Sequence, residues 1–167
     1  LATAVAAVTW MTIDWIHSGR PTCVGMCTGA VAGLVAITPA AGSTDVLGAI
    51  CIGLITSMIC YFMVAFVKRV CGYDDALDAF GVHGIGGIIG SILTGVFATT
   101  GGVCGALYGD WHQLGVQLIA TVFGIAFSGV LTWIIFVIID KTIGMRVDTR
   151  VEEEGLDIYE HGETAYN

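Results

Sequence analysis

The residues best able to do chemistry lie between Asp74 and Gly90, in the run DDALDAFGVHGIGGIIG. The first five residues of this run include three carboxylates, on Asp74, Asp75 and Asp78. His83 follows five residues after the last of them and enters a segment that is otherwise apolar and rich in glycine. A neutral imidazole both donates and accepts a hydrogen bond, which suits a proton relay or the binding of a small polar solute. The run therefore predicts a site of that kind centred on His83.

Two interpretations of His83 stay open from the residues alone. In the first, the imidazole faces a cavity or the interior of a helix bundle and takes part in function, as ionisable residues in membrane segments usually do. In the second, it is a buried histidine whose hydrogen bonds are satisfied within the fold. On a helix, His83 shares a face with small residues only, at Gly86, Gly87, Gly90 and Thr94. Side chains this small leave space for a lumen, which favours the functional interpretation.

The composition is that of a polytopic membrane protein. Hydrophobic residues make up 56% of the 167 residues and charged residues 12%, and a soluble domain carries roughly twice that charged fraction. The 24 glycines suit membrane helices whose backbones approach closely. The net charge is −8, and there is no basic patch that would bind nucleic acid. We therefore expect membrane lipid as a partner and no nucleic acid.

Five apolar runs predict an all-α membrane helix bundle in residues 1–140, followed by a polar tail in residues 141–167. A helix needs about 20 mostly apolar residues to cross a bilayer. Backbone polar groups cannot stay unpaired in lipid, and none of the runs alternates as barrel strands do, so helices are expected. The expected spans cover residues 1–16, 22–40, 46–67, 80–99 and 113–139.

The basic residues predict the orientation of these helices. All six fall on one side of the membrane if five spans are present, at Arg20, Lys68, Arg69, Lys141, Arg146 and Arg150. The connections over residues 41–45 and 101–112 hold none. Cytoplasmic loops are enriched in lysine and arginine, so we expect a multi-pass protein whose C-terminus is cytoplasmic.

The three carboxylates before His83 lie on that same cytoplasmic side. Asp78 is placed to cap the start of a helix, where an acid meets the positive end of the helix dipole. An ion pair of Arg20 with Asp74 or Asp75 is a further structural hypothesis. Capping and solvation on one hand, and a role in a pore on the other, remain open for these acids.

Glycines spaced at intervals of four predict helix-packing faces. The second expected helix carries Gly25, Gly29 and Gly33, and the fourth carries Gly86 and Gly90. Small residues at such positions let two helix backbones come into contact. We interpret both faces as packing surfaces.

Signals for an enzyme or a cofactor are absent from the sequence. It contains no GxSxG, no HExxH and no phosphate-binding glycine loop with lysine. The six cysteines are interpreted as small apolar residues, without a disulfide framework or a zinc site. We therefore expect no catalytic residues, no metal and no cofactor.

The stretch from Asp74 to Gly90, which fits D-D-x-x-D-x-F-G-x-H-G, resembles the signature of the Amt branch of the Amt/Mep/Rh ammonium transporter family. Residues 19–42, GRPTCVGMCTGAVAGLVAITPAAG, and residues 155–167, GLDIYEHGETAYN, resemble two further motifs of that family in the same order. The resemblance covers essentially the whole chain. It corresponds to the last five of the family's eleven helices, so we interpret the chain as a fragment of a longer protein.

The resemblance implies a homotrimer in the plasma membrane, with a narrow apolar pore lined by paired histidines in each subunit. His83 matches the histidine of the tenth helix, and Asp78 matches the acid that precedes it. Ala79 would lie near the cytoplasmic mouth and Thr38 near the outer vestibule. The implied solute is ammonium, with methylammonium as its analogue. The first histidine of the pair belongs to helices that this chain does not contain.

Two functions follow from this resemblance. The first is a transporter subunit for nitrogen uptake that conducts ammonium or ammonia, with a PII-type signal protein as the implied partner of its tail in prokaryotic members. The second is an ammonium sensor or receptor with a transporter-like body that signals through its cytoplasmic tail.

Overall fold

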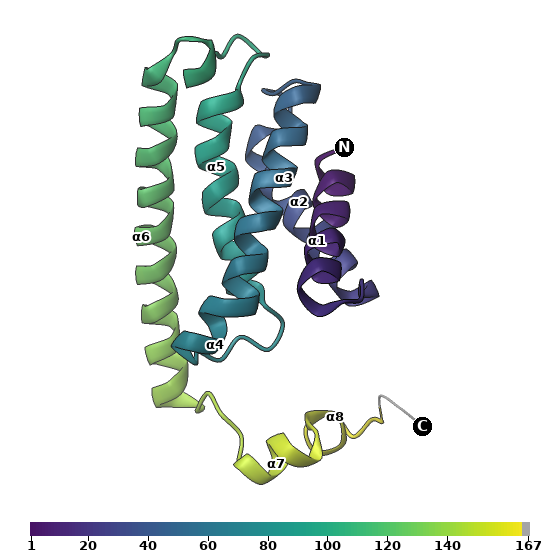
Figure 1. The fold of residues 1–167 in the computed structure, drawn as a ribbon. Helices are drawn as coiled ribbons and strands as arrows, with labels where there is room; N and C mark the ends of the chain where they lie inside the picture. Colours follow the sequence, from purple (N-terminus) through teal and green to yellow (C-terminus); the bar gives the residue numbers. More distant parts are fainter. Residues whose placement is uncertain (165–167) are drawn as a thin grey trace. The chain divides into compact units, whose positions relative to one another are not determined.

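A computed structural model describes residues 1–164, and the regular elements in that range are helices (Figure 1). One isolated β-bridge joins Thr44 and Ala98. The chain divides into two units, Leu1–Phe123 and Gly124–Asn167. The all-helical architecture confirms the predicted fold class.

The first unit contains α1 (Ala2–Ser18), α2 (Cys23–Ile37), α3 (Val46–Phe62), α4 (Lys68–Cys71), α5 (Ile85–Phe97) and the start of α6 (Trp111–Thr142). Two 3₁₀ turns, η1 (Thr38–Ala40) and η4 (Ala106–Tyr108), follow α2 and precede α6. Two π-turns, η2 (Met63–Val67) and η3 (Phe80–Gly84), join α3 to α4 and begin the α5 helix. The second unit contains the rest of α6 with α7 (Thr149–Glu154) and α8 (Leu156–Tyr159).

Four helices in the described residues are long and apolar enough to cross a membrane, over Cys23–Ala40, Val46–Cys71, Phe80–Phe97 and Trp111–Thr142. They occupy the four later runs expected from the sequence. α1 occupies the first run but has only 17 residues. A fifth membrane span over residues 1–16 therefore stays a prediction.

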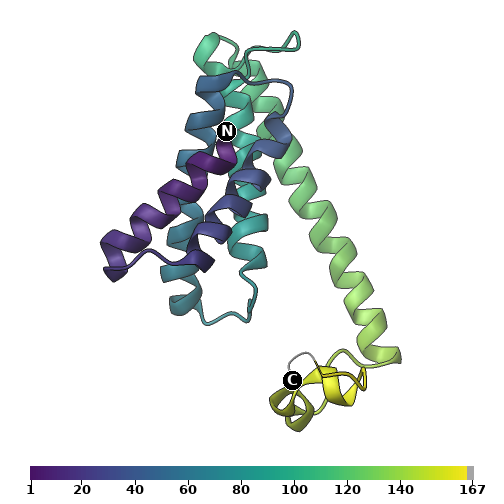
Figure 2. The ribbon, with the colours of Figure 1, turned by 90° about the vertical axis from the view of Figure 1, so that its right-hand side faces the viewer.

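Glycines on α2 lie directly against α1, which crosses α2 and α3 (Figure 2). A Cβ atom added at Gly29 would lie 2.5 Å from Cβ of Trp10, and one at Gly33 would lie 2.7 Å from Cβ of Ala6. Real Cβ atoms do not come this close to other atoms, so the α1–α2 contact needs glycine at these positions.

α5 makes the same kind of contact with α2 and α6. A Cβ atom added at Gly90 would lie 2.3 Å from the carbonyl oxygen of Ala36, which is a backbone atom near the end of α2. One added at Gly95 would lie 2.8 Å from Cα of Leu114. Backbone cannot swing aside as a flexible side chain does, so these glycines determine how closely α5 packs.

The two connections without basic residues are hydrogen-bonded to each other. The amide of Thr99 donates to the carbonyl of Ser43 over 2.7 Å, and the Thr44 hydroxyl donates to the carbonyl of Phe97 over 3.1 Å. The α2–α3 and α5–α6 connections therefore lie at one end of the first unit. This arrangement agrees with the prediction that both are on the same side of the membrane.

We predict that Gly90→Ala destabilises the protein, while Gly87→Ala on the same helix does not. The new methyl at residue 90 would overlap the backbone of Ala36, and overpacking of this kind typically costs about 1–3 kcal/mol of the free energy of unfolding. At Gly87 the nearest atom to an added Cβ is 4.0 Å away, and alanine favours the helix by up to about 1 kcal/mol. Thermal unfolding midpoints of the two variants in detergent test this, and equal midpoints would contradict the packing role.

Candidate functional site

His83 lies within the π-turn η3, at the start of the long helix that continues as α5. The amide of Ile85 donates to the carbonyl of Phe80, five residues earlier, which closes the wide turn. The His83 side chain is exposed on the surface of the described residues. The first unit thus presents the imidazole on an open face, between the beginning of α2 and the beginning of the α5 helix.

A hollow of about 400 Å³ lies beside His83. Its walls are mostly apolar side chains and thiols, from Cys23, Val24, Cys27, Thr28, Val31, Leu77, Val82 and His83. Such walls solvate an ion poorly, because a charge loses its hydration there without gaining a counter-ion. The hollow therefore suits a small uncharged solute, with the imidazole as its main hydrogen-bonding group.

A second, more polar hollow of about 290 Å³ shares Val24 and Thr28 with the first. Five ionisable side chains line it, from Asp14, His17, Tyr61, Arg69 and Asp78. The Tyr61 hydroxyl lies 3.2 Å from Nδ1 of His17, and the Thr22 hydroxyl donates to Asp14 over 2.6 Å. A polar compartment thus adjoins the apolar one at the end of the unit that carries Arg69.

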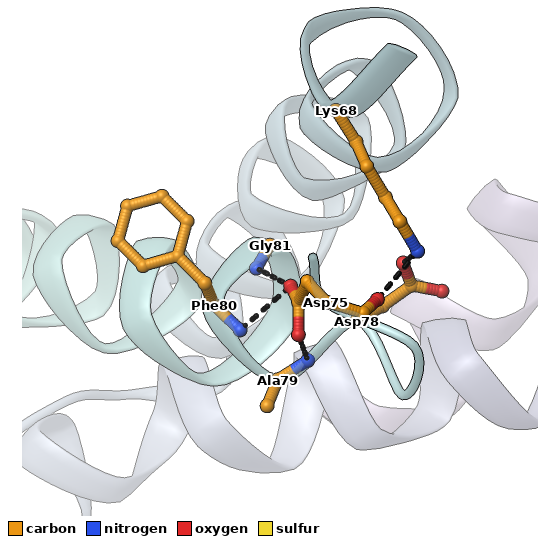
Figure 3. A network of polar contacts seen from close by, with 6 residues as sticks. All are labelled: Lys68, Asp75, Asp78, Ala79, Phe80 and Gly81. Carbon is orange, nitrogen blue, oxygen red and sulfur yellow. Dashed lines mark hydrogen bonds and ion pairs between the residues drawn. The ribbon is translucent and has the colours of Figure 1, made fainter. Parts of the chain in front are cut away.

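Asp75, not Asp78, caps the helix that carries His83 (Figure 3). Its carboxylate accepts hydrogen bonds from the backbone amides of Ala79 at 2.8 Å, Phe80 at 3.0 Å and Gly81 at 3.3 Å. These amides belong to the first turn of the helix and would otherwise have no hydrogen-bond acceptor. The capping role proposed for Asp78 from the sequence therefore belongs to the carboxylate three residues earlier.

Asp78 instead forms an ion pair with Lys68, with 2.7 Å between Nζ and Oδ1. The same ammonium group donates to the backbone carbonyl of Asp75. The backbone of Asp78 has a positive φ of 54°. Residues other than glycine adopt this conformation uncommonly, and aspartate is enriched among those that do. From its place in the sequence, Lys68 has a topological role only, because nothing in the local pattern shows that its side chain reaches ten residues ahead to Asp78.

The remaining predicted residues lie at the two ends of the first unit. Ala79 is exposed, and its backbone amide donates a hydrogen bond to the Asp75 carboxylate. Thr38 is exposed at the far end of α2, where its hydroxyl donates to the carbonyl of Leu34 over 2.7 Å. Arg20 is exposed in the connection before α2. Its pairing with Asp74 or Asp75 stays a prediction.

The tail carries its own charged pairs. Arg146 binds both carboxylate oxygens of Glu152, at 2.8 and 3.0 Å, and Arg150 binds Glu154 at 2.8 Å. The hydrogen bond from the Arg146 guanidinium lowers the pKa of Glu152. The family-like motif over residues 155–167 is described as far as residue 164, and its last three residues lie outside the described part of the chain.

Four long apolar helices in the described residues, packed through glycine, identify a multi-pass membrane protein. The sequence profile of the Ammonium Transporter Family matches residues 1–166. The chain belongs to this family.

Relatives with the same family name are found in distant bacteria. The "Ammonium transporter" of Aquifex aeolicus is 50% identical over 169 residues, covering 100% of this chain and 40% of the relative. That of Bacillus subtilis is 43% identical, covering 99% of this chain and 42% of the relative. The chain therefore spans about two fifths of the length of these relatives. Their names describe transporters, which agrees with the expectation that the chain is not an enzyme.

Solved structures of similar proteins share the helix arrangement. Saccharomyces cerevisiae Mep2 matches with a TM-score of 0.82 and 36% identity, over 89% of this chain and 36% of that one. A protein described as "Sensor Amt Protein" matches with a TM-score of 0.84 and 30% identity, over 95% of this chain and 39% of that one.

We predict that Arg146→Ala raises the pKa of Glu152 towards its ordinary value. The guanidinium stabilises the charged carboxylate. The pair therefore contributes to the stability of the fold at neutral pH, and this contribution is lost as the pH falls through the lowered pKa of Glu152. A ¹³C titration of the Glu152 carboxyl in the whole protein in detergent measures the change. Arg150→Ala is the control, because Arg150 pairs with Glu154, and it should leave the Glu152 titration in place. An unchanged titration in Arg146→Ala would show that the pair does not form.

Proposed function

We propose that this chain is the C-terminal part of an ammonium transporter subunit and corresponds to the last five of eleven helices. The observation that carries the proposal is the 50% identity to the Aquifex aeolicus ammonium transporter over all of this chain. The coverage supports the fragment interpretation, because the chain matches only 40% of that relative. The proposed assembly is a homotrimer in the plasma membrane with a cytoplasmic C-terminus.

In this proposal, the open face around His83 is one wall of a pore, and helices outside this chain supply the opposite wall and a second histidine. Support comes from the exposure of His83 beside an apolar hollow that is open on one side. A polar side chain facing lipid is costly, and such residues normally face the interior of a bundle or a water-filled cavity. A covering segment removes that cost and converts the hollow into an enclosed passage.

The chemistry of the two hollows supports conduction with separation of a proton. Ammonium is charged and is poorly accommodated by the apolar hollow, whereas ammonia is neutral and hydrogen-bonds to an imidazole as donor or acceptor. Ammonium therefore transfers its proton to water, and the resulting ammonia enters the apolar part of the path. The polar hollow, which Asp78 lines, is the next compartment, where ammonia can take up a proton from water and become ammonium again.

The other predicted residues take supporting places in this scheme. Ala79 lies at the cytoplasmic mouth, and Thr38, at the opposite end of α2, lies near the outer vestibule. The charged tail is the surface proposed for a PII-type signal protein. Methylammonium, which carries the same kind of donor groups as ammonium, serves as the transported analogue.

A sensor is the second candidate, because one of the similar solved structures is described as "Sensor Amt Protein", although the curated relatives are named as transporters. The two candidates differ in bulk flux, since a sensor needs to bind ammonium without passing it at a rate that feeds the cell. Expression of the complete protein in cells that lack their own ammonium transporters separates the two. Growth on low ammonium supports the transporter, and binding without rescued growth supports the sensor.

We predict that His83→Ala in the complete protein lowers methylammonium uptake into proteoliposomes on the order of a hundredfold, the range typical of a lost proton-transferring group. The control is His112→Ala, because His112 is an exposed histidine at the start of α6, away from the hollow. It should transport like the parent protein. Parental uptake and selectivity in His83→Ala would remove the pore role from this residue.

A further inference from the structure

The two π-turns of the first unit, which are far apart in sequence, lie against each other. In η2 the amide of Lys68 donates to the carbonyl of Met63, and in η3 the amide of Ile85 donates to the carbonyl of Phe80. A Cβ atom added at Gly81 in η3 would lie 2.8 Å from Cγ2 of Val64 in η2. π-turns are rare and are found frequently at functional sites, and this packed pair includes the turn that carries His83.

A π-turn changes the direction in which its side chains point. It inserts one residue into the helix, and one residue corresponds to about 100° of rotation about the helix axis. If η3 relaxed to an ordinary α-turn, the side chains before α5 would rotate by roughly that angle relative to α5. The direction of the His83 imidazole towards the hollow therefore depends on this turn.

Asp75 holds the beginning of η3. Its carboxylate accepts hydrogen bonds from the backbone amides of Ala79, Phe80 and Gly81. A single carboxylate that accepts hydrogen bonds from three consecutive amides determines both where the helix begins and how its first turn is oriented. The ring of Tyr73 packs edge-on against the ring of Phe80, with 5.7 Å between centroids, and covers the same turn.

Lys68 connects this cap to the other π-turn. Its backbone amide closes η2, and its side chain reaches the Asp75 carbonyl and the Asp78 carboxylate at the entrance to η3 (Figure 3). The side chains of Lys68 and Asp78 are only 28% and 26% exposed, so water screens the pair less than it screens a fully exposed one. One residue thus joins both wide turns through its main chain and its side chain.

We propose that Lys68 and Asp75 are positioning residues that hold η3 as a π-turn and so direct the His83 imidazole into the apolar hollow. This role rests on the proposed transport function, because its effect on flux passes through His83. Neither side chain lines the apolar hollow. Both act through the backbone on which the imidazole is carried.

The test uses the complete protein in proteoliposomes with Lys68→Met, Lys68→Arg and, as a matched control, Lys141→Met. Lys141 is an exposed lysine in the last turn of α6, and its side chain lines neither hollow. Initial rates of methylammonium uptake are measured over a concentration series and normalised to folded protein. This yields a maximal rate and a half-saturating concentration for each variant.

Lys68→Met is expected to lower the maximal rate about tenfold or more, since a displacement of about 1 Å at a reacting group can cost a hundredfold. The half-saturating concentration should stay within about twofold, because the binding of ammonium precedes the passage along His83. Lys68→Arg keeps a cation at the same place and should recover most of the rate. Lys141→Met should behave like the parent protein.

Several results overturn the proposal. A parental maximal rate in Lys68→Met does so, as does an equal loss in Lys141→Met or no recovery in Lys68→Arg. If Lys68→Met does not fold, Asp75→Asn replaces it with the same readouts, because the amide keeps the size of the side chain and removes its charge. If neither folds while Lys141→Met does, the network serves folding and the positioning role is rejected.

His83→Ala in the same series separates this proposal from the function on which it rests. If His83→Ala transports like the parent protein, the pore assignment fails and the positioning role falls with it. If His83→Ala is impaired and Lys68→Met is not, the pore assignment stands and only the positioning role is rejected.

Discussion

Backbone contact at glycine is the constraint on which the arrangement of the first unit depends. The carbonyl oxygen of Ala2 would lie 2.4 Å from a Cβ at Gly53 and 2.8 Å from one at Gly33, so α1 meets α3 and α2 with no side chain between them. In lipid, helices gain nothing from burying apolar surface against one another, and close packing with hydrogen bonds has to hold them together. The largest fully buried side chains fit this picture, because they are of modest size: Ile52, Thr56, Cys60 and Ser57.

Much of this arrangement can be predicted from the sequence, because hydropathy, glycine spacing and basic residues are properties of single segments. The long apolar runs predict the helices, and the spacing of Gly25, Gly29 and Gly33 predicts a packing face. In the structure, these glycines lie against residues of α1. The contacts around the candidate site are different in kind. They depend on how the connection before His83 folds back in three dimensions. This fold brings the Lys68 side chain to Asp78, and it lets the Asp75 carboxylate accept hydrogen bonds from backbone amides. The π-turns also leave no mark in a hydrophobic pattern.

The candidate site combines two compartments whose walls differ in polarity. Next to His83 the walls are mostly apolar, whereas the adjoining hollow contains Asp14, His17 and Asp78. Crossing the boundary from the polar to the apolar compartment raises the free energy of the charged form of a solute far more than that of the neutral form, because only the charged form loses strong hydration there. Val24 and Thr28 belong to both hollows and mark that boundary. Selectivity between ions and neutral species can thus arise from the walls, without a dedicated binding cage.

The hydrogen-bonded connections at one end of the unit have a mechanical consequence. Ser43 and Thr99 join the connections that lead into α3 and out of α5, so a tilt between the two helices would move their opposite ends more than the hydrogen-bonded ends. The helix over Phe80–Phe97 has 18 residues and is about 27 Å long. A tilt of about 5° at the hydrogen-bonded end would move the other end by about 2 Å over that length. The Lys68–Asp78 pair lies at that other end, so a small angular change at the distant connections would become an ångström-scale displacement at the imidazole.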